Sequence, residues 1–155
     1  MNASIHRLRG VLAIIAVALP TSADANAPAG QYVVTAGGTG NGTVYDTKSK
    51  LTWQRTVSST TYTWADAKTY CAGVGASLGG TGWRLPTLKE LQTIVDYSQS
   101  IPSIDSTAFP STPATWFWSA SPVAGSSSDA WGVSFSDGDS GDSVVSDSSS
   151  VRCVR

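Results

Sequence analysis

Histidine and glutamate are almost absent from this chain of 155 residues, and both absences limit the chemistry that it can perform. The single histidine is His6, near the start of the chain, and the single glutamate is Glu90. With no histidine after residue 6, a Ser-His-Asp or Cys-His arrangement, a histidine-ligated zinc site and imidazole acid–base catalysis all lack their central group. Paired-carboxylate catalysis would depend on aspartates alone. The sequence therefore predicts a protein that is not an enzyme and that holds no cofactor.

Positive charge is scarce in the second half of the chain. The formal net charge is −1 at pH 7, which gives no electrostatic reason to bind nucleic acid. Between residues 98 and 151 there is no lysine or arginine. The same segment carries these aspartates: Asp105, Asp129, Asp137, Asp139, Asp142 and Asp147. The sequence therefore predicts an acidic second half and no nucleic-acid partner.

Long hydrophobic runs are also missing. The longest apolar run, residues 11–19, is shorter than the roughly 20 residues that a membrane-spanning helix needs, so we expect no membrane span. The run follows the basic residues Arg7 and Arg9 and precedes Ala23-Asp24-Ala25, a small-x-small cleavage pattern. Residues 1–25 are therefore predicted to be a signal peptide, which would export the protein to the periplasm, the cell surface or the medium.

The rest of the chain is long enough for one domain with a single core. Residues 26–42 are rich in Ala, Gly and Thr and are predicted to be a flexible leader, which leaves 43–155 as the domain. The domain opens with two β-favouring segments, 44–46 and 51–54, on either side of a polar turn, a pattern typical of a hairpin.

Two helices are predicted next. Thr63 with Asp66 resembles a capping box, and apolar residues at helical spacing follow it as far as the glycines Gly73 and Gly75. Thr87 with Glu90 forms a complete capping box, and the apolar stripe behind it predicts a helix to about residue 97.

Strands are predicted to replace helices in the last third of the chain. Short β-type runs at 115–121, 130–135, 144–145 and 151–155 are separated by Gly, Ser and Asp. Two helices followed by a meander of strands predict an α+β domain with small antiparallel sheets.

The two cysteines lie in different predicted elements, Cys71 on the first helix and Cys153 on the last strand. In an exported chain with no other cysteine, this pattern favours a disulfide between them. The alternative, a free reactive thiol, would need a nearby base and a reducing compartment, and the sequence indicates neither.

A series of short motifs runs in order through the domain: Val44-Tyr45-Asp46, Leu51-Thr52-Trp53-Gln54-Arg55, Trp64-Ala65-Asp66-Ala67, Trp83-Arg84-Leu85-Pro86-Thr87, Trp118-Ser119, Ala130-Trp131 and Val151-Arg152-Cys153-Val154-Arg155. This series resembles the bacterial Lcl C-terminal domain family. The resemblance implies a C-type-lectin-like fold, in which two helices flank small antiparallel sheets and a disulfide joins a helix to the last strand. It also implies an exported adhesin-like module that binds glycans, notably sulfated glycosaminoglycans.

Six tryptophans are many for a domain of this size, and an exposed indole could stack on the C–H face of a sugar. We expect Trp53, Trp64, Trp83 and Trp131 in the core, because they fall in family motifs or on apolar faces. Trp116 and Trp118 share one face of a predicted strand, so at least one of them is expected to be exposed. Both are candidate ligand contacts, and Trp116 is the better one for stacking.

Aspartates cluster between residues 137 and 142, where Asp137, Asp139 and Asp142 lie on a Gly-rich turn. Such carboxylates can converge on calcium, but Asp-Gly is also an ordinary hairpin turn, and the sequence departs from the EF-hand pattern at Gly141. We expect no metal here and keep calcium as the alternative. Asp129, Asp137 and Asp139 are candidate ligand contacts as well.

Arg84 and Arg152 are candidate contacts to an anionic ligand, with a structural role for each as the alternative. If the last strand pairs near the first hairpin, these two arginines and Arg155 could form one basic patch with the hairpin cations, which are Lys48, Lys50 and Arg55.

These features predict an exported, non-catalytic binding module for an extracellular glycan. Recognition would combine aromatic stacking with hydrogen bonds from Ser, Thr and Asp side chains between residues 115 and 143. The alternative is a cell-envelope module that binds a protein partner, or is structural, and has no sugar ligand. An enzyme related to the formylglycine-generating fold is disfavoured, because that chemistry needs an available thiol or a metal and both cysteines are assigned to structure.

Overall fold

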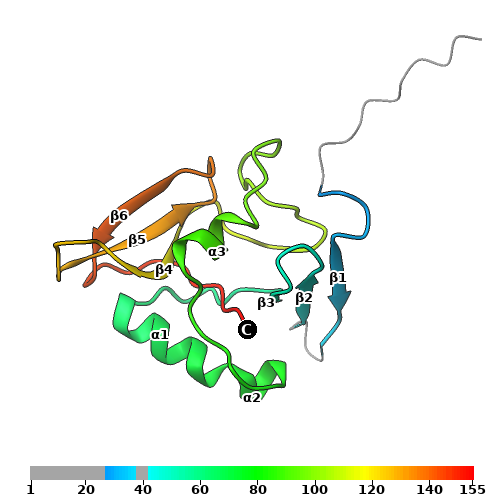
Figure 1. The fold of residues 1–155 in the computed structure, drawn as a ribbon, viewed down its shortest axis with the longest axis horizontal. Helices are drawn as coiled ribbons and strands as arrows, with labels where there is room; N and C mark the ends of the chain where they lie inside the picture. Colours follow the sequence, from blue (N-terminus) through cyan, green and yellow to red (C-terminus); the bar gives the residue numbers. More distant parts are fainter. Residues whose placement is uncertain (1–26, 38–41) are drawn as a thin grey trace, which may run out of the picture.

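The computed structural model of the chain describes residues 27–37 and 42–155. The predicted signal peptide, residues 1–25, lies outside the described residues. The described chain forms an α+β domain with two small sheets and short helices between them, as predicted (Figure 1). In chain order the elements are β1 (Tyr32–Thr35), β2 (Thr43–Asp46), β3 (Thr52–Gln54), α1 (Trp64–Gly73), α2 (Gly75–Leu78), α3 (Leu88–Gln92), β4 (Trp116–Pro122), β5 (Asp129–Ser134) and β6 (Ser140–Val144).

The first sheet has the strand order β1-β2-β3 and is antiparallel throughout. The predicted hairpin forms as β2 and β3, so that prediction is confirmed. Residues 32–35 of the predicted leader form β1, which adds an edge strand to this hairpin, with Val33 opposite Tyr45. The ring of Tyr32 packs edge-on against Phe109, 5.2 Å between ring centroids, which ties β1 to the loop before β4.

The second sheet, β4-β5-β6, is the predicted meander of strands. Phe117 and Val133 face a core cluster that includes Leu91 of α3. Trp118 and Ala130 face the opposite way, into a second cluster with Ala67 and Cys71 of α1. The sheet therefore lies between two helices and is buried on both faces in the part of β4 from Phe117 to Ser119.

Helix α1 begins as predicted, because the Thr63 side chain accepts a hydrogen bond from the Asp66 amide. The capping box at the start of α3 is also confirmed, but the helix ends at Gln92 and not near residue 97. The Asp96 amide donates to the Ser103 carbonyl at 3.0 Å, so it is not available for a helical bond to Gln92. A tertiary hydrogen bond thus ends a helix that its apolar stripe would have continued.

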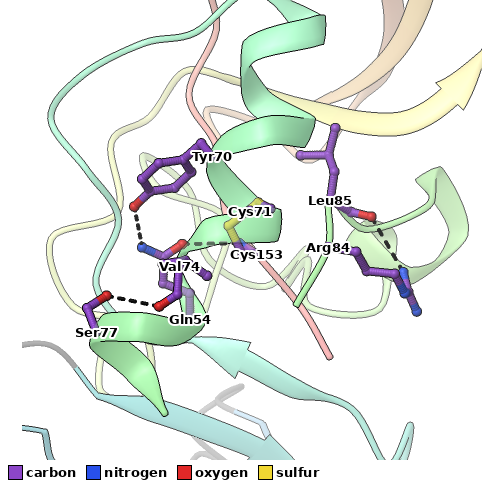
Figure 2. Close-up of a disulfide and its surroundings, with 8 residues drawn as sticks. All are labelled: Gln54, Tyr70, Cys71, Val74, Ser77, Arg84, Leu85 and Cys153. Carbon is purple, nitrogen blue, oxygen red and sulfur yellow. Dashed lines mark hydrogen bonds between the residues drawn. A yellow bond between two sulfur atoms is a disulfide. The ribbon is translucent and has the colours of Figure 1, made fainter. Parts of the chain in front are cut away.

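The predicted strand 151–155 is replaced by an extended segment with isolated bridges. Val154 pairs with both Trp53 and Arg84, so the segment lies between β3 and the chain that leads to α3. The predicted disulfide between Cys71 and Cys153 is confirmed (Figure 2). Beside it, the Gln54 side chain accepts a hydrogen bond from the Cys153 amide and donates one to the Tyr70 hydroxyl. The disulfide and Gln54 together join α1, β3 and the C-terminus.

Candidate functional site

Trp116, at the start of β4, is the one tryptophan with a largely exposed side chain in the part of the chain that the structure describes, at 46%. Its indole lies against two glycines that are paired with each other, Gly132 of β5 and Gly141 of β6. A Cβ on Gly141 would come within 2.8 Å of the ring. The two glycines therefore leave room for the indole beside the strands, where most side chains would displace it.

Trp118 lies two residues further along the same face of β4, yet it is 1% exposed. Its indole N–H donates to the Tyr62 carbonyl at 2.9 Å, and residues of α1 pack against it. The prediction that at least one of the two tryptophans is exposed is confirmed at Trp116. Trp118, predicted as a ligand contact, is a core residue, because α1 and the chain before it cover this part of the strand.

The four tryptophans assigned to the core divide into two pairs. Trp53 and Trp83 are buried, whereas Trp64 and Trp131 are half-buried. Trp64 donates its indole N–H to the Ser119 carbonyl at 2.7 Å, and the ammonium of Lys68 lies 3.3 Å from the centre of its ring. That ring is thus already covered by a side chain of its own helix, which makes it a poor platform for a sugar.

Two hollows flank the Trp116 indole, and we call them together the Trp116 groove. The first has a volume of about 650 Å³ and is lined mainly by hydroxyl side chains of residues 58–61, 111–115 and 148–150. The second has a volume of about 540 Å³ and lies over β4, β5 and β6. Trp116, Ser148 and Ser149 line both hollows. Each hollow alone falls in the size range of small-molecule sites, about 300–1,000 Å³.

Backbone pairing brings these distant segments together. Tyr62 and Ser149 exchange two hydrogen bonds of 3.0 Å, and the Ser150 amide donates to the Trp116 carbonyl at 3.0 Å. Residues 148–150 are thus held between β4 and the chain that leads into α1. This pairing explains why the hydroxyl-rich stretches 58–61 and 146–150 form one surface with Trp116.

The groove carries very little charge. None of the described residues that line it is Lys or Arg. Asp147 is exposed, and its carboxylate accepts a hydrogen bond of 2.9 Å from the Ser143 hydroxyl. Asp142 also borders the second hollow, but alternation along β6 puts its side chain on the same face as Ser140, which is hydrogen-bonded to Gln92 of α3. We therefore assign one carboxylate to the groove, that of Asp147.

The other acidic candidates lie in or next to the hairpin turns, outside the groove. The Asp129 carboxylate accepts a hydrogen bond from the Ser128 hydroxyl at 3.2 Å. Asp137 accepts one from the Asp139 amide, which lowers the pKa of the Asp137 carboxyl. Within the described ranges, no group of three or more His, Cys, Asp or Glu residues is placed to hold a metal ion. These aspartates stabilise the hairpin turns β4–β5 and β5–β6, and the structure does not bring them to Trp116.

Arg84 forms an ion pair with Glu90, with two hydrogen bonds of 2.6 and 2.8 Å. Hydrogen bonding to Arg84 is the largest cause that holds the pKa of Glu90 at about 2, and the Thr87 amide and hydroxyl add to it. The same pair raises the pKa of Arg84. This guanidinium is committed to the first turn of α3 and lines neither hollow of the groove.

Arg152 has no exposed surface, so it cannot make the ligand contact for which the sequence made it a candidate. Its guanidinium donates to the carbonyls of Gln54 and Arg55, both at 2.9 Å, and to the Thr112 hydroxyl at 2.7 Å. It also stacks over the ring of Phe109, 4.6 Å from the ring centre. Burial lowers the pKa of Arg152 to about 9, which still leaves it charged at neutral pH.

The C-terminal segment does pair with β3, the condition set for a basic patch. The arginines are nevertheless divided among other contacts, because Arg152 is buried and Arg84 is paired with Glu90. Arg55 donates to the Thr107 carbonyl, and Arg155 packs over the ring of Trp83. The predicted basic patch is therefore not present as a set of free cations.

A further hollow of about 620 Å³ lies between β1, the β2–β3 turn and the chain after α3. It is lined by three aspartates and Lys48, but each carboxylate bonds to its own turn. Asp46 accepts from the Lys48 amide and the Ser49 hydroxyl, Asp96 from the Ser98 amide, and Asp105 from the Thr107 amide. Most of its acceptors are thus in use within the fold, although Asp96 Oδ2 is buried without a hydrogen-bond partner among the described residues, whereas the Trp116 groove presents an open aromatic face.

The sequence identified Trp116 but missed much of the groove around it. Ser58, Ser59 and Thr61 lie before α1, and Asp147 and Ser148 lie after β6, outside the segment 115–143 expected to hold the ligand. Their one signal is composition, since both stretches are dense in hydroxyl side chains. Composition alone does not indicate that the two stretches meet.

Comparison with known families gives a match over most of the chain. Residues 42–155 match the model of the Lcl C-terminal domain, which is more than half of the chain. A search of the curated proteins finds no match. In the described part of the chain, no helix has the length and apolar character needed to cross a membrane.

Proposed function

The chain belongs to the Lcl C-terminal domain family, and from this membership we propose that it is an exported, non-catalytic module that binds an extracellular glycan on the Trp116 groove. The family suggests an adhesin-like binding module. The glycan is proposed from one observation: a 46% exposed indole stands between two hollows lined by hydroxyl groups. Aromatic surface next to hydroxyls matches the two faces of a sugar, C–H above and below the ring and O–H around its edge.

Binding would use a surface that is formed before the ligand arrives. The indole is backed by Gly132 and Gly141, and residues 148–150 are held by backbone bonds to β4 and to Tyr62. Little backbone freedom would be lost at these positions, which favours affinity. Serine and threonine hydroxyls both donate and accept hydrogen bonds, as sugar hydroxyls do.

Export and the absence of catalysis belong to the same proposal. A disulfide between Cys71 and Cys153 is typical of proteins from oxidising compartments. In the groove, the Asp147 carboxylate is bonded to Ser143, and the other acid that borders the hollow, Asp142, has its side chain on the opposite face of β6. We therefore assign the groove to recognition.

A protein partner is the second candidate, and the first sheet supports it. Val33, Val34 and Tyr45 on β1 and β2 are 51%, 42% and 38% exposed. Val33 and Tyr45 are opposite each other and share one face of the sheet, and exposed apolar side chains on an edge strand and its neighbour are typical of a contact surface. This surface would serve an envelope partner in place of a sugar, or beside one.

A glycan array probed with the purified chain tests the proposal. We expect binding to a defined set of sugars that is lost in Trp116→Ala and kept in Tyr97→Ala, which removes a 72% exposed aromatic residue outside the groove. Silence across the array, together with capture of an envelope protein that free sugars do not release, would support the protein partner. Equal binding by both variants would show that the ligand does not bind in the groove.

A further inference from the structure

The two hollows of the Trp116 groove define a ligand longer than one sugar. Because Trp116, Ser148 and Ser149 border both hollows, the space continues past the indole on either side. A single ring stacked on Trp116 would leave both hollows, of about 650 and 540 Å³, largely unfilled. A chain that crosses the indole would place one unit on the ring and at least one more in each hollow.

The charge of the lining residues indicates which class of glycan the groove binds. Sulfate and carboxylate groups on a glycan are recognised by Arg and Lys, and none of the described residues lining either hollow is a cation. Asp147 would instead stand next to an anionic ligand and repel it. The sequence supplies no cation nearby along the chain, since residues 98–151 contain no lysine or arginine.

The polar groups that are present suit uncharged hydroxyls. Ser58, Ser59, Thr61, Ser148 and Ser149 offer both donors and acceptors around the indole. The Asp147 carboxylate accepts one bond from Ser143 and has further acceptor positions, which neutral sugar hydroxyls can fill.

On the basis of the function proposed above, we infer that the groove binds an internal stretch of an uncharged oligosaccharide that crosses Trp116, with sugar units in both hollows. The ligand is thus neither a polyanion nor a single terminal sugar. This assignment differs from the sulfated glycans that the family resemblance implies, and it follows from the residues of this groove.

Calorimetric titration of the full chain tests the inference. The probes are a ladder of neutral glucan and chitin oligosaccharides, from monosaccharide to hexasaccharide, and heparin as the sulfated probe. Affinity for the neutral ladder should rise about tenfold from monosaccharide to tetrasaccharide, which equals about 1.4 kcal/mol. It should change by less than about twofold between low salt and about 0.5 M sodium chloride, because no ion pair forms.

A variant that fills one hollow separates the effect of ligand length from the effect of sugar stacking on Trp116. Ser59 is exposed and lines the first hollow, so Ser59→Trp should remove most of the gain beyond the disaccharide while disaccharide binding remains. Thr69→Trp is the matched control, because it puts the same side chain on an exposed position of α1 that lines neither hollow. The control should bind the whole ladder as the unmodified chain does.

The outcomes separate this inference from the function on which it rests. Tighter binding of heparin than of the neutral ladder, with a steep loss in salt, would overturn the uncharged ligand and leave glycan binding in place. A monosaccharide that binds as tightly as the tetrasaccharide would overturn the crossing chain. Failure of every neutral and sulfated probe would overturn glycan binding itself, and the inference with it.

Discussion

Arg152 shows how a single residue organises the centre of this domain. Its guanidinium reaches the carbonyls of Gln54 at the end of β3 and of Arg55 just after it, and the hydroxyl of Thr112 before β4, a segment far away in sequence. No acidic side chain is hydrogen-bonded to it among the described residues, so backbone carbonyls, one hydroxyl and the Phe109 ring balance the buried charge. A planar fork of donors suits this set of acceptors, and a lysine could not reproduce it.

We predict that Arg152→Ala lowers the free energy of unfolding by about 3–5 kcal/mol, because it removes three hydrogen bonds, two of them buried, and leaves a cavity in the core. Arg152→Lys should keep the positive charge but lose the forked set of donors, so its free energy of unfolding should lie between those of the unmodified chain and Arg152→Ala. Urea unfolding followed by fluorescence measures both. Lys89→Ala, an exposed position of α3, should change the value by less than about 0.5 kcal/mol. A loss of that small size in Arg152→Ala would show that the guanidinium is not a structural tie.

Trp116 and Trp118 show where sequence reasoning reaches its limit for a residue. Both fit one face of β4 and both were predicted as ligand contacts, yet one is 46% and the other 1% exposed. What separates them is how far α1 and Tyr62 extend along the sheet, a tertiary fact. The residue type indicated a binding aromatic, and packing decided which one.

At the scale of the elements, α3 depends on its N-terminus. The helix spans only Leu88–Gln92, too short to be stable by propensity alone. Its capping box is reciprocal: the Thr87 hydroxyl accepts a hydrogen bond from the Glu90 amide, and the Glu90 carboxylate accepts one from the Thr87 amide. Arg84 then adds a paired charge to the same carboxylate.

The low pKa of Glu90 predicts how the stability of the domain responds to acid. The pKa is about 2 when folded and near 4.5 ordinarily, so the unfolded chain takes up the proton first as pH falls. Stability supplied by this carboxylate is complete above about pH 4.5 and is lost between there and about pH 2. Because the site is partly solvent-exposed, we expect this carboxylate to contribute about 1–2 kcal/mol to the free energy of unfolding. Urea unfolding across this pH range measures it.

Glu90→Gln is the control for that prediction. It removes the titrating group, so the part of the acid loss that belongs to Glu90 should disappear while the other carboxylates keep theirs. An unchanged pH profile in this variant would contradict the assignment of the stabilisation to the Arg84–Glu90 pair.

The glycines of β5 and β6 give a paired prediction for the sheet. A Cβ on Gly132 would meet the Phe117 carbonyl oxygen at 2.7 Å, whereas one on Gly141 would meet the outer edge of the Trp116 indole at 2.8 Å. Backbone cannot move aside easily, but an exposed side chain can. Gly132→Ala should therefore cost about 1–3 kcal/mol of folding stability, and Gly141→Ala less than about 1 kcal/mol.

Binding should respond in the opposite order, because Gly141→Ala displaces the indole from the groove. Its affinity for the best ligand should fall by about tenfold although the domain is nearly as stable as before. Thermal unfolding and titration of the same samples make the comparison. Full affinity in Gly141→Ala would mean that the position of the indole does not matter to the ligand.

The elements themselves were largely predictable. Hairpin β2–β3, the capped starts of α1 and α3 and the strands β4 and β5 follow from local signals: alternation, capping residues and turn glycines. Strand β6 begins at Ser140, inside the stretch 137–142 that was predicted as a turn. Other errors occur where long-range hydrogen bonds override local signals. At the end of α3 the Asp96 amide bonds to Ser103, and in 151–155 Val154 forms isolated bridges to Trp53 and Arg84 in place of a strand.

At the scale of the whole molecule, the fold is closed by its C-terminus. The last residues lie between β3 and the chain before α3, and Cys153 is bonded to Cys71 on α1 (Figures 1 and 2). The bond closes a loop with a sequence separation of 82. For a loop of that length the chain-entropy estimate of stabilisation is about 4.5 kcal/mol.

We predict that replacing both cysteines by alanine lowers the free energy of unfolding by about 3–5 kcal/mol. The unmodified chain should show the same loss when it is unfolded in urea with a strong reductant, and the variant should not respond to the reductant. A variant as stable as the oxidised chain would show that Gln54 and the bridges of Val154 already hold the C-terminus.

The groove is a property of the whole molecule, and this explains why the sequence did not reveal it. Its walls come from residues before α1, from β4 to β6 and from the chain after β6, and the Tyr62–Ser149 pairing joins them. No local pattern encodes that pairing. Composition did predict the electrostatic character of the groove, because the absence of cations between residues 98 and 151 is visible in the sequence.

The central claim is that ligand binds across Trp116, and nuclear magnetic resonance tests it most directly. The labelled full chain would be titrated with the neutral oligosaccharide that binds best. We predict the largest shifts at the Trp116 indole N–H and at the amides of Thr61 and residues 147–149 on the two sides of the groove. Shifts centred on the hollow beside Tyr32 and Asp96, with Trp116 unchanged, would contradict the account.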